Sequence, residues 1–163
     1  KSCCYDKGAS GDVEYLFNWC GHGGCTPSEP GTLRGTDPGY GSGDYQASRD
    51  NGARSHNGQD FVAYAGQPVQ AVIDGVVTRV FPVYEDNPSL TGVEIVNQAG
   101  VSAKVFYVTP TQGIVGSSVR AGDVIGVAQD LGTRYPGITN HNHVEIKVQG
   151  VLKDPSNYFL IGM

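Results

Sequence analysis

The chain has 163 residues, 39% hydrophobic and 17% charged, so it is long enough for one globular domain and differs in composition from disordered tails and coiled coils. The formal net charge is −5 and Lys and Arg form no cluster, which argues against nucleic acid as a partner. No apolar run approaches the roughly 20 residues of a membrane-spanning helix, so we expect no membrane span.

The N-terminal segment, residues 1–25, contains all four cysteines of the chain, Cys3, Cys4, Cys20 and Cys25. An even number of cysteines in a loop-rich segment predicts disulfide bonds and therefore a mature, secreted extracellular protein. The alternative is a structural zinc site, but adjacent Cys3 and Cys4 fit the paired ligand spacing of such sites poorly. Three disulfide pairings remain open. We expect this segment to pack on the main body through its apolar stretch, residues 13–19 (VEYLFNW).

Residues 26–55 change character, being rich in Gly, Pro, Ser and Asp and almost empty of aliphatic side chains. Such a segment cannot bury enough apolar surface to form a core element. We therefore predict a long surface loop, of a length that is often functional. Tyr40 and Tyr45 are either contact residues of this loop or ordinary solvated tyrosines.

Residues 56–163 read as a single β-rich domain. In residues 70–81 (QAVIDGVVTRVF) the apolar pattern is broken only by Asp74-Gly75, a dipeptide typical of a hairpin turn. Further strand patterns lie at residues 93–96, 101–108, 118–128 and 143–148. Short strands separated by turn signals predict a mainly β fold with an antiparallel sheet or sandwich as its core.

Two short motifs contain three of the four histidines of the chain. His141 and His143 lie two residues apart at the start of a predicted strand, so their side chains point to the same face. His56 and Asp60 flank a Gly turn that can bring both side chains to one point. Alone, each of these residues is more often structural, but imidazole and carboxylate together suit zinc. The combined pattern predicts a zinc site with an open coordination position.

The motifs are similar to those of a known family. Residues 54–61 (RSHNGQDF) resemble the His-x-x-x-Asp motif of lysostaphin-like zinc endopeptidases, and residues 140–146 (NHNHVEI) resemble the family's His-x-His pair at the start of a strand. Residues 65–77 and 119–132 resemble the intervening segments in the same order. The resemblance implies the lysostaphin-like peptidase fold over residues 56–163.

The resemblance also implies a division of roles, in which the Zn²⁺ ligands are His56, Asp60 and His143. His141 then takes the place of a catalytic histidine that does not bind the metal. Active members have another histidine in a Tyr-x-His-Leu-like stretch, where this chain has residues 105–110 (VFYVTP), with Tyr107 or Val108 at the histidine position. Loss of one proton-transfer group costs on the order of 10² to 10⁴ in rate. His141 and Tyr107 are therefore catalytic candidates only if the chain is an active enzyme, with Tyr107 donating to an oxyanion.

A non-enzymatic branch of this family, the secreted leukocyte cell-derived chemotaxins, is similar in further detail. Residues 105–110, 134–146 (RYPGITNHNHVEI) and 20–25 (CGHGGC) resemble that branch. This resemblance implies a Cys20–Cys25 bridge. We expect His22, between the two cysteines, to be an exposed loop residue; the alternative is a further zinc contact or a lid over the open site. The long loop at residues 26–55 departs from the branch, so the identity of a partner does not transfer.

Three functions follow in order of preference. We expect a secreted zinc-binding, non-catalytic signalling or recognition protein whose ligand is an extracellular protein, peptide or glycan. The first alternative is a zinc endopeptidase that cleaves Gly-rich or cell-wall peptides. The second is an extracellular matrix or structural assembly protein that self-associates through its Gly/Tyr-rich loop.

Overall fold

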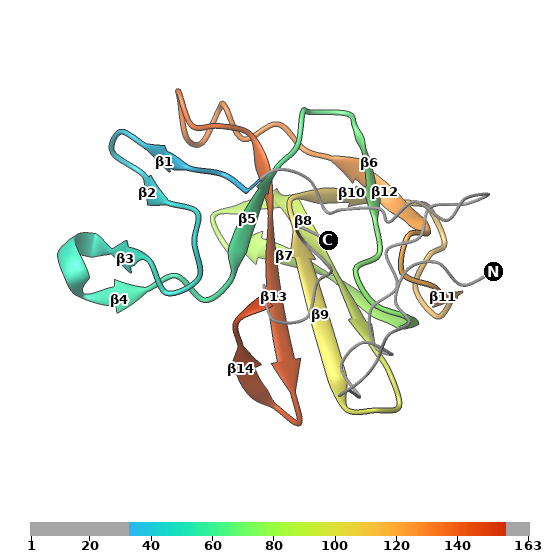
Figure 1. The fold of residues 1–163 in the computed structure, drawn as a ribbon. Coiled ribbons are helices and arrows are strands. Elements are labelled where there is room, and N and C mark those ends of the chain that lie inside the picture. The colour runs from blue at the N-terminus through green and yellow to red at the C-terminus, as the bar shows by residue number, and fades with distance from the viewer. Residues whose placement is uncertain (1–32, 156–163) are drawn as a thin grey trace.

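The computed structural model describes residues 33–155, in which the regular elements are β-strands and short 3-10 turns (Figure 1). The prediction of a mainly β, antiparallel fold is thus confirmed. Within these residues, no helix is long and apolar enough to cross a bilayer. The predictions for residues 1–25, including the cysteines, their pairing and His22, lie outside the described residues.

The larger of the two main sheets has seven antiparallel strands. In spatial order they are β11 (Ser118–Val119), β7 (Gly75–Tyr84), β8 (Asn87–Val96), β9 (Val101–Phe106), β13 (His141–Val148) and β14 (Val151–Lys153), with β5 (Gln59–Val62) also paired to β13. β5 pairs with the first half of β13, whereas β14 pairs with the second half. His143 and Val144 are therefore held between two strands, β9 and β5.

The smaller sheet contains β10 (Val108–Pro110), β12 (Val124–Ala128) and β6 (Pro68–Gln70), also antiparallel. Its buried side chains meet those of the larger sheet in one apolar core, which includes Val69, Ile125, Val93, Val105 and Val144. Alternating burial along β9 leaves one face of the larger sheet in the core and turns the other face away from it. The candidate functional residues lie on this second face.

The chain crosses between the two sheets at residues 71–74, and this corrects the hairpin prediction at Asp74-Gly75. β6 and β7 belong to different sheets and do not pair with each other. The Asp74 carboxylate accepts a hydrogen bond from the Ala121 backbone N–H at 2.7 Å. A Cβ on Gly75 would lie 2.6 Å from the carbonyl oxygen of Val96, so this glycine permits close packing of two strands rather than a tight turn.

The hairpin that does form joins β7 and β8 through a two-residue loop, Glu85-Asp86, with Tyr84 opposite Asn87. Sequence reasoning missed it because Pro82 and Pro88 lie within the strands, and proline lacks the N–H that a strand interior normally uses. A shift of register between Pro82 and Tyr84 accommodates the first of them.

Residues 33–55 form two small hairpins beside β5 (Figure 1). They are β1 (Thr36–Asp37) with β2 (Gly41–Ser42), and β3 (Ser48–Arg49) with β4 (Arg54–Ser55), the second closed by the 3-10 turn Asp50–Gly52. The backbone of Arg34 donates to the Asp60 carbonyl at 2.8 Å, and the Asp60 N–H donates to the Gly43 carbonyl at 2.9 Å. These bonds attach the segment to β5. The division into residues 1–25, 26–55 and 56–163 remains a prediction.

Candidate metal centre

The register of β5 on β13 brings the two sequence motifs together. His143 lies directly opposite Asp60 across this antiparallel pair. His56 lies on the turn before β5, and Gly58 lets that turn cross β13 closely, because a Cβ there would be 2.1 Å from the carbonyl oxygen of Val144. The glycine of the His-Asn-Gly-Gln-Asp motif thus places His56 over the strand that carries His143.

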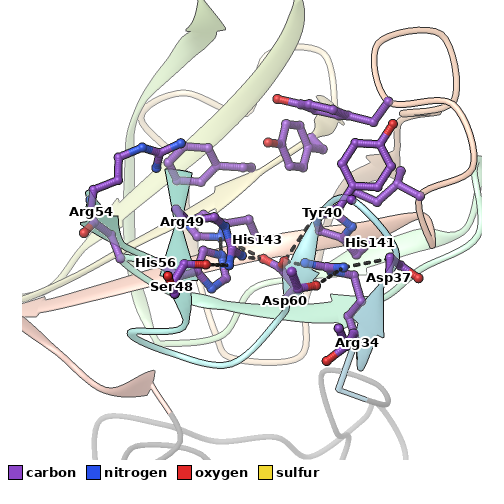
Figure 2. A pocket seen from close by; sticks show the side chains of 18 of the residues that line it. Arg34, Asp37, Tyr40, Ser48, Arg49, Arg54, His56, Asp60, His141 and His143 are labelled. Atoms are coloured by element: carbon purple, nitrogen blue, oxygen red, sulfur yellow. Dashed lines mark hydrogen bonds and ion pairs between the residues drawn. The ribbon is translucent and has the colours of Figure 1, made fainter. Parts of the chain in front are cut away.

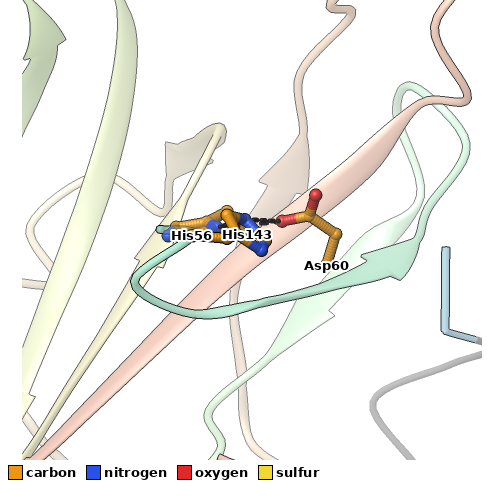
Figure 3. A group of neighbouring side chains, drawn as sticks. All are labelled: His56, Asp60 and His143. Atoms are coloured by element: carbon orange, nitrogen blue, oxygen red, sulfur yellow. Dashed lines mark hydrogen bonds and ion pairs between the residues drawn. The ribbon is translucent and has the colours of Figure 1, made fainter. Parts of the chain in front are cut away.

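Three buried ligand atoms converge on one point, as Figure 3 shows. His56 Nε2 lies 2.9 Å from His143 Nδ1, His143 Nδ1 lies 2.8 Å from Asp60 Oδ1, and His56 Nε2 lies 3.1 Å from the same oxygen. Tetrahedral zinc with bonds of about 2 Å separates its ligand atoms by roughly 3.3 Å. The separations are thus close to those of a zinc site.

Hydrogen bonds on the far sides of the imidazoles fix which nitrogen faces this point. His56 Nδ1 lies 2.8 Å from the Asp44 carbonyl oxygen, which only accepts, so Nδ1 donates and Nε2 keeps its lone pair in the neutral ring. His143 Nε2 lies 2.9 Å from the Glu145 carboxylate, so Nε2 donates and, in the neutral ring, Nδ1 has the lone pair. Such outer partners orient the histidine ligands of metal sites. Two lone pairs and a carboxylate oxygen directed at one point fit a divalent cation.

The ionisation of Asp60 suits metal binding, whereas His143 has to give up a proton when a metal binds. Burial raises the pKa of Asp60, but hydrogen bonds from His143 and His56 outweigh it and hold that pKa well below its usual range. Burial lowers the pKa of His143, yet its bonds to Asp60 and Glu145 raise it to about 9. A carboxylate that stays ionised while buried is a suitable ligand for a metal cation.

A buried arginine holds the second oxygen of the Asp60 carboxylate. Arg34, only 2% exposed, donates from Nε to Asp60 Oδ2 at 3.0 Å and from Nη1 to Asp37 at 2.7 Å. Asp37 in turn accepts from the backbone N–H and hydroxyl of Thr139. Sequence reasoning missed Arg34 and Asp37, because an Arg and an Asp three residues apart in a Gly-rich segment carry no distinctive signal.

His141 faces the same centre from the start of β13. Its Nδ1 donates to the Thr139 carbonyl at 2.7 Å, so Nε2 points toward Asp60 Oδ2, 3.5 Å away. Burial lowers the pKa of His141, more than the negative charge of Asp60 raises it. A neutral imidazole beside the metal ligands can accept a proton.

Tyr107 lies where the chain crosses from β9 to β10. Its backbone has a positive φ of 71°, an uncommon conformation for a bulky residue, which ends β9 within the stretch predicted as one strand. The ring meets His141 edge to face at 5.6 Å, but the hydroxyl bonds that of Tyr84 at 2.7 Å. The Tyr84 hydroxyl also bonds that of Tyr135. Burial raises the pKa of Tyr107 far above its ordinary value and that of Tyr84 to about 12, so both phenols stay neutral.

All five residues proposed from the sequence line one pocket of about 840 Å³, together with Arg34 and Asp37 (Figure 2). The pocket lies between the two small hairpins, the loop before β13 and the site face of the larger sheet. The residues proposed as zinc ligands form a compact group, whereas the Tyr107 hydroxyl bonds that of Tyr84.

Comparisons with known proteins agree with the expected fold. Residues 54–155 match the model of peptidase family M23. The chain is 28% identical over 134 residues to leukocyte cell-derived chemotaxin-2 of Bos taurus, covering 82% of this chain and 83% of that protein. The Mus musculus protein of that name is 31% identical over 122 residues, with coverages of 74% and 77%.

Among solved structures, the antimicrobial peptidase lysostaphin of Staphylococcus simulans is similar with a TM-score of 0.55 and 24% identity, covering 74% of this chain and 48% of that chain. This chain thus spans about half the length of the lysostaphin structure. At this identity the likeness establishes the fold, and the predicted lysostaphin-like architecture is confirmed.

Proposed function

Because this chain belongs to peptidase family M23, we propose that it is a secreted zinc-binding recognition protein that keeps the metal site of the fold without a full hydrolytic set. One observation carries the proposal: Tyr107 lies beside His141, and its hydroxyl is engaged by Tyr84. A phenol with a strongly raised pKa is a poor substitute for an imidazole that exchanges protons near neutral pH.

The donor set supports zinc as the metal. His56, Asp60 and His143 would hold it through two nitrogens and one oxygen, with the outer contacts described above. When bound, zinc can polarise a carbonyl group and lower the pKa of a bound water. Binding would also join the turn before β5 to β13, so metal affinity would contribute to folding.

The groups beside the ligands favour binding over hydrolysis. Hydrolysis needs proton transfer and stabilisation of a developing oxyanion. Of the described residues that line the pocket, His141 is the one imidazole besides the two ligands. The similarity to chemotaxin-2 supports an extracellular recognition role, with a protein, peptide or glycan as the ligand.

The test compares wild-type protein with His143→Ala for zinc content and for hydrolysis of oligoglycine and mixed peptides. We expect about one zinc per wild-type chain, loss of zinc in the variant, and no zinc-dependent hydrolysis. A chain that never takes up zinc would contradict the metal role, and zinc-dependent cleavage would contradict the non-catalytic role.

A zinc endopeptidase acting on Gly-rich or cell-wall peptides is the second candidate. His141 favours it, because its Nε2 faces the metal centre while Nδ1 is anchored on Thr139. In that case His141 would accept the proton of the attacking water. His141→Ala should then abolish hydrolysis and leave zinc content unchanged.

A further inference from the structure

The two oxygens of the Asp60 carboxylate have different partners. Oδ1 lies 2.8 Å from His143 Nδ1 and 3.1 Å from His56 Nε2, so it belongs to the group of candidate ligand atoms. Oδ2 accepts a hydrogen bond from Arg34 Nε at 3.0 Å and lies 3.5 Å from His141 Nε2. One oxygen therefore faces the metal centre, while the other is held by the arginine.

The guanidinium of Arg34 is also fixed on the side away from Asp60. Its Nη1 donates to Asp37 Oδ2 at 2.7 Å and to the Gly41 carbonyl at 3.1 Å. Asp37 in turn accepts from the backbone N–H of Thr139 at 2.9 Å and from its hydroxyl at 2.7 Å. Figure 2 shows the Arg34 guanidinium between Asp60 and Asp37. The β1–β2 hairpin and the loop before β13 together prevent the guanidinium from turning away.

Burial makes the bond between Arg34 and Asp60 costly to break. Each of the two residues is only 2% exposed, so water cannot readily replace either partner. A Cβ on Gly43 would lie 2.6 Å from the Arg34 carbonyl oxygen and 3.1 Å from Asp60 Cβ, so glycine there lets the chain close over the pair. A buried charge that loses its partner is strongly destabilising. A metal that took both Asp60 oxygens would have to displace Arg34 Nε from Oδ2.

Metal ions differ in how many carboxylate oxygens they favour. Zn²⁺ in proteins is usually tetrahedral and accepts nitrogen and oxygen ligands, whereas Mn²⁺ suits octahedral sites rich in carboxylate, carbonyl and water oxygens. Ca²⁺ takes still more oxygen ligands and often binds both oxygens of a carboxylate. Two imidazole nitrogens and one carboxylate oxygen therefore suit Zn²⁺. A carboxylate free to offer both oxygens would suit ions of higher coordination number better.

We propose that Arg34, fixed by Asp37, is the residue that makes the metal centre selective for Zn²⁺ over ions of higher coordination number such as Mn²⁺. By occupying Oδ2 it restricts Asp60 to a single bond with the metal. The inference rests on the proposed zinc-binding function and extends it beyond the three ligands. Arg34 acts through Asp60 and is thus a positioning residue.

The test measures the dissociation constants of Zn²⁺ and Mn²⁺ by chelator competition, using the full chain of wild type and of Arg34→Met at one pH. Loss of an outer partner of a ligand should weaken Zn²⁺ binding about 10- to 100-fold. Mn²⁺ binding should weaken less or become tighter, because the freed Oδ2 adds a ligand. The ratio of the Mn²⁺ constant to the Zn²⁺ constant should thus fall at least about tenfold.

The ratio separates coordination from charge. The positive charge of Arg34 opposes any divalent cation, but it affects two ions of equal charge alike and therefore cancels in the ratio. Arg120→Met, which removes an exposed arginine outside the pocket, is the matched control and should keep the wild-type ratio. Co²⁺ gives an independent readout, because tetrahedral Co²⁺ absorbs visible light much more strongly than octahedral Co²⁺. We expect weaker visible bands from Co²⁺-loaded Arg34→Met than from Co²⁺-loaded wild type.

A second variant, Asp37→Asn, keeps Arg34 but removes the charge that fixes its Nη1. We expect it to lower the ratio by about threefold, and it decides the question if Arg34→Met does not fold. A ratio equal to that of wild type in folded Arg34→Met, or in Asp37→Asn where the first variant does not fold, would overturn the selectivity role and leave the zinc function standing. Absence of zinc uptake by wild type would contradict both.

Discussion

His141 and His143 lie two residues apart on one face of β13, yet their surroundings differ. His143 Nε2 bonds Glu145, and this contact directs Nδ1 toward His56 and Asp60. His141 is equally well anchored, but its aromatic neighbour is Tyr107, whose hydroxyl bonds Tyr84. We therefore propose that metal binding and proton transfer depend on separate parts of this fold, the first on the β5–β13 register and the second on the residue at the β9–β10 crossing.

The largest expected effect comes from replacing Arg34, which supports the metal-binding residues. Arg34→Met leaves Asp60 Oδ2 and Asp37 without the guanidinium that holds them. Removing one partner of a buried ion pair typically costs about 3–5 kcal/mol of unfolding free energy. Urea denaturation of metal-free protein measures this, with Arg120→Met as the exposed control. A loss below about 1 kcal/mol would show that the buried network is not a stabilising unit.

A second substitution distorts the turn that places His56. In Gly58→Ala the new Cβ would stand 2.1 Å from the Val144 carbonyl oxygen, so the turn must move away from β13. We expect about 2–4 kcal/mol lower stability and at least about tenfold weaker zinc binding in chelator competition, because His56 moves with the turn. Gly35→Ala, where nothing lies within 4 Å of the added methyl, is the matched control. Unchanged zinc affinity in Gly58→Ala would contradict this role.

The metal-binding group could be predicted from the sequence better than the tyrosine cluster around Tyr107. The His-x-x-x-Asp and His-x-His motifs lie on elements whose character follows from alternation and one glycine, so convergence of the two motifs could be inferred. The choice of His143 over His141 as the third ligand comes from the family resemblance. The positive φ of Tyr107 is imposed by the crossing between sheets, a long-range constraint that residues 101–108 do not reveal. Arg34 was equally hidden, since its burial depends on Asp60, 26 residues away.

A third substitution perturbs only the tyrosine cluster and leaves the metal-binding residues unchanged. Tyr84→Phe removes the hydroxyl that bonds both Tyr107 and Tyr135. Leaving the buried Tyr107 hydroxyl unsatisfied costs about 1–2 kcal/mol, so thermal unfolding should move to lower temperature while zinc affinity stays unchanged. Tyr64→Phe is the control, because Tyr64 is 75% exposed. Weaker zinc binding in Tyr84→Phe would show that the tyrosine cluster and the metal-binding residues are not independent.

The smallest effect is expected at Gln59, which neighbours Asp60 but points to the opposite, core-facing side of β5. Within residues 33–155, its buried Oε1 atom finds no hydrogen-bond partner. Gln59→Met should therefore leave stability unchanged or raise it by up to about 1 kcal/mol, without altering zinc affinity. Chemical denaturation beside the exposed control Gln112→Met measures the difference. A clear loss of stability would mean that the amide has a structural role.

The central claim is that hydrolysis is limited by the residue at position 107 and not by the metal site. The most direct measurement is the zinc-dependent rate of oligoglycine cleavage by wild type and by Tyr107→His, in samples of equal zinc content. We predict no cleavage by wild type and a measurable zinc-dependent rate in the variant, since a restored proton-transfer group is worth on the order of 10² to 10⁴ in rate. Cleavage by wild type at a rate equal to or above that of Tyr107→His would contradict the claim.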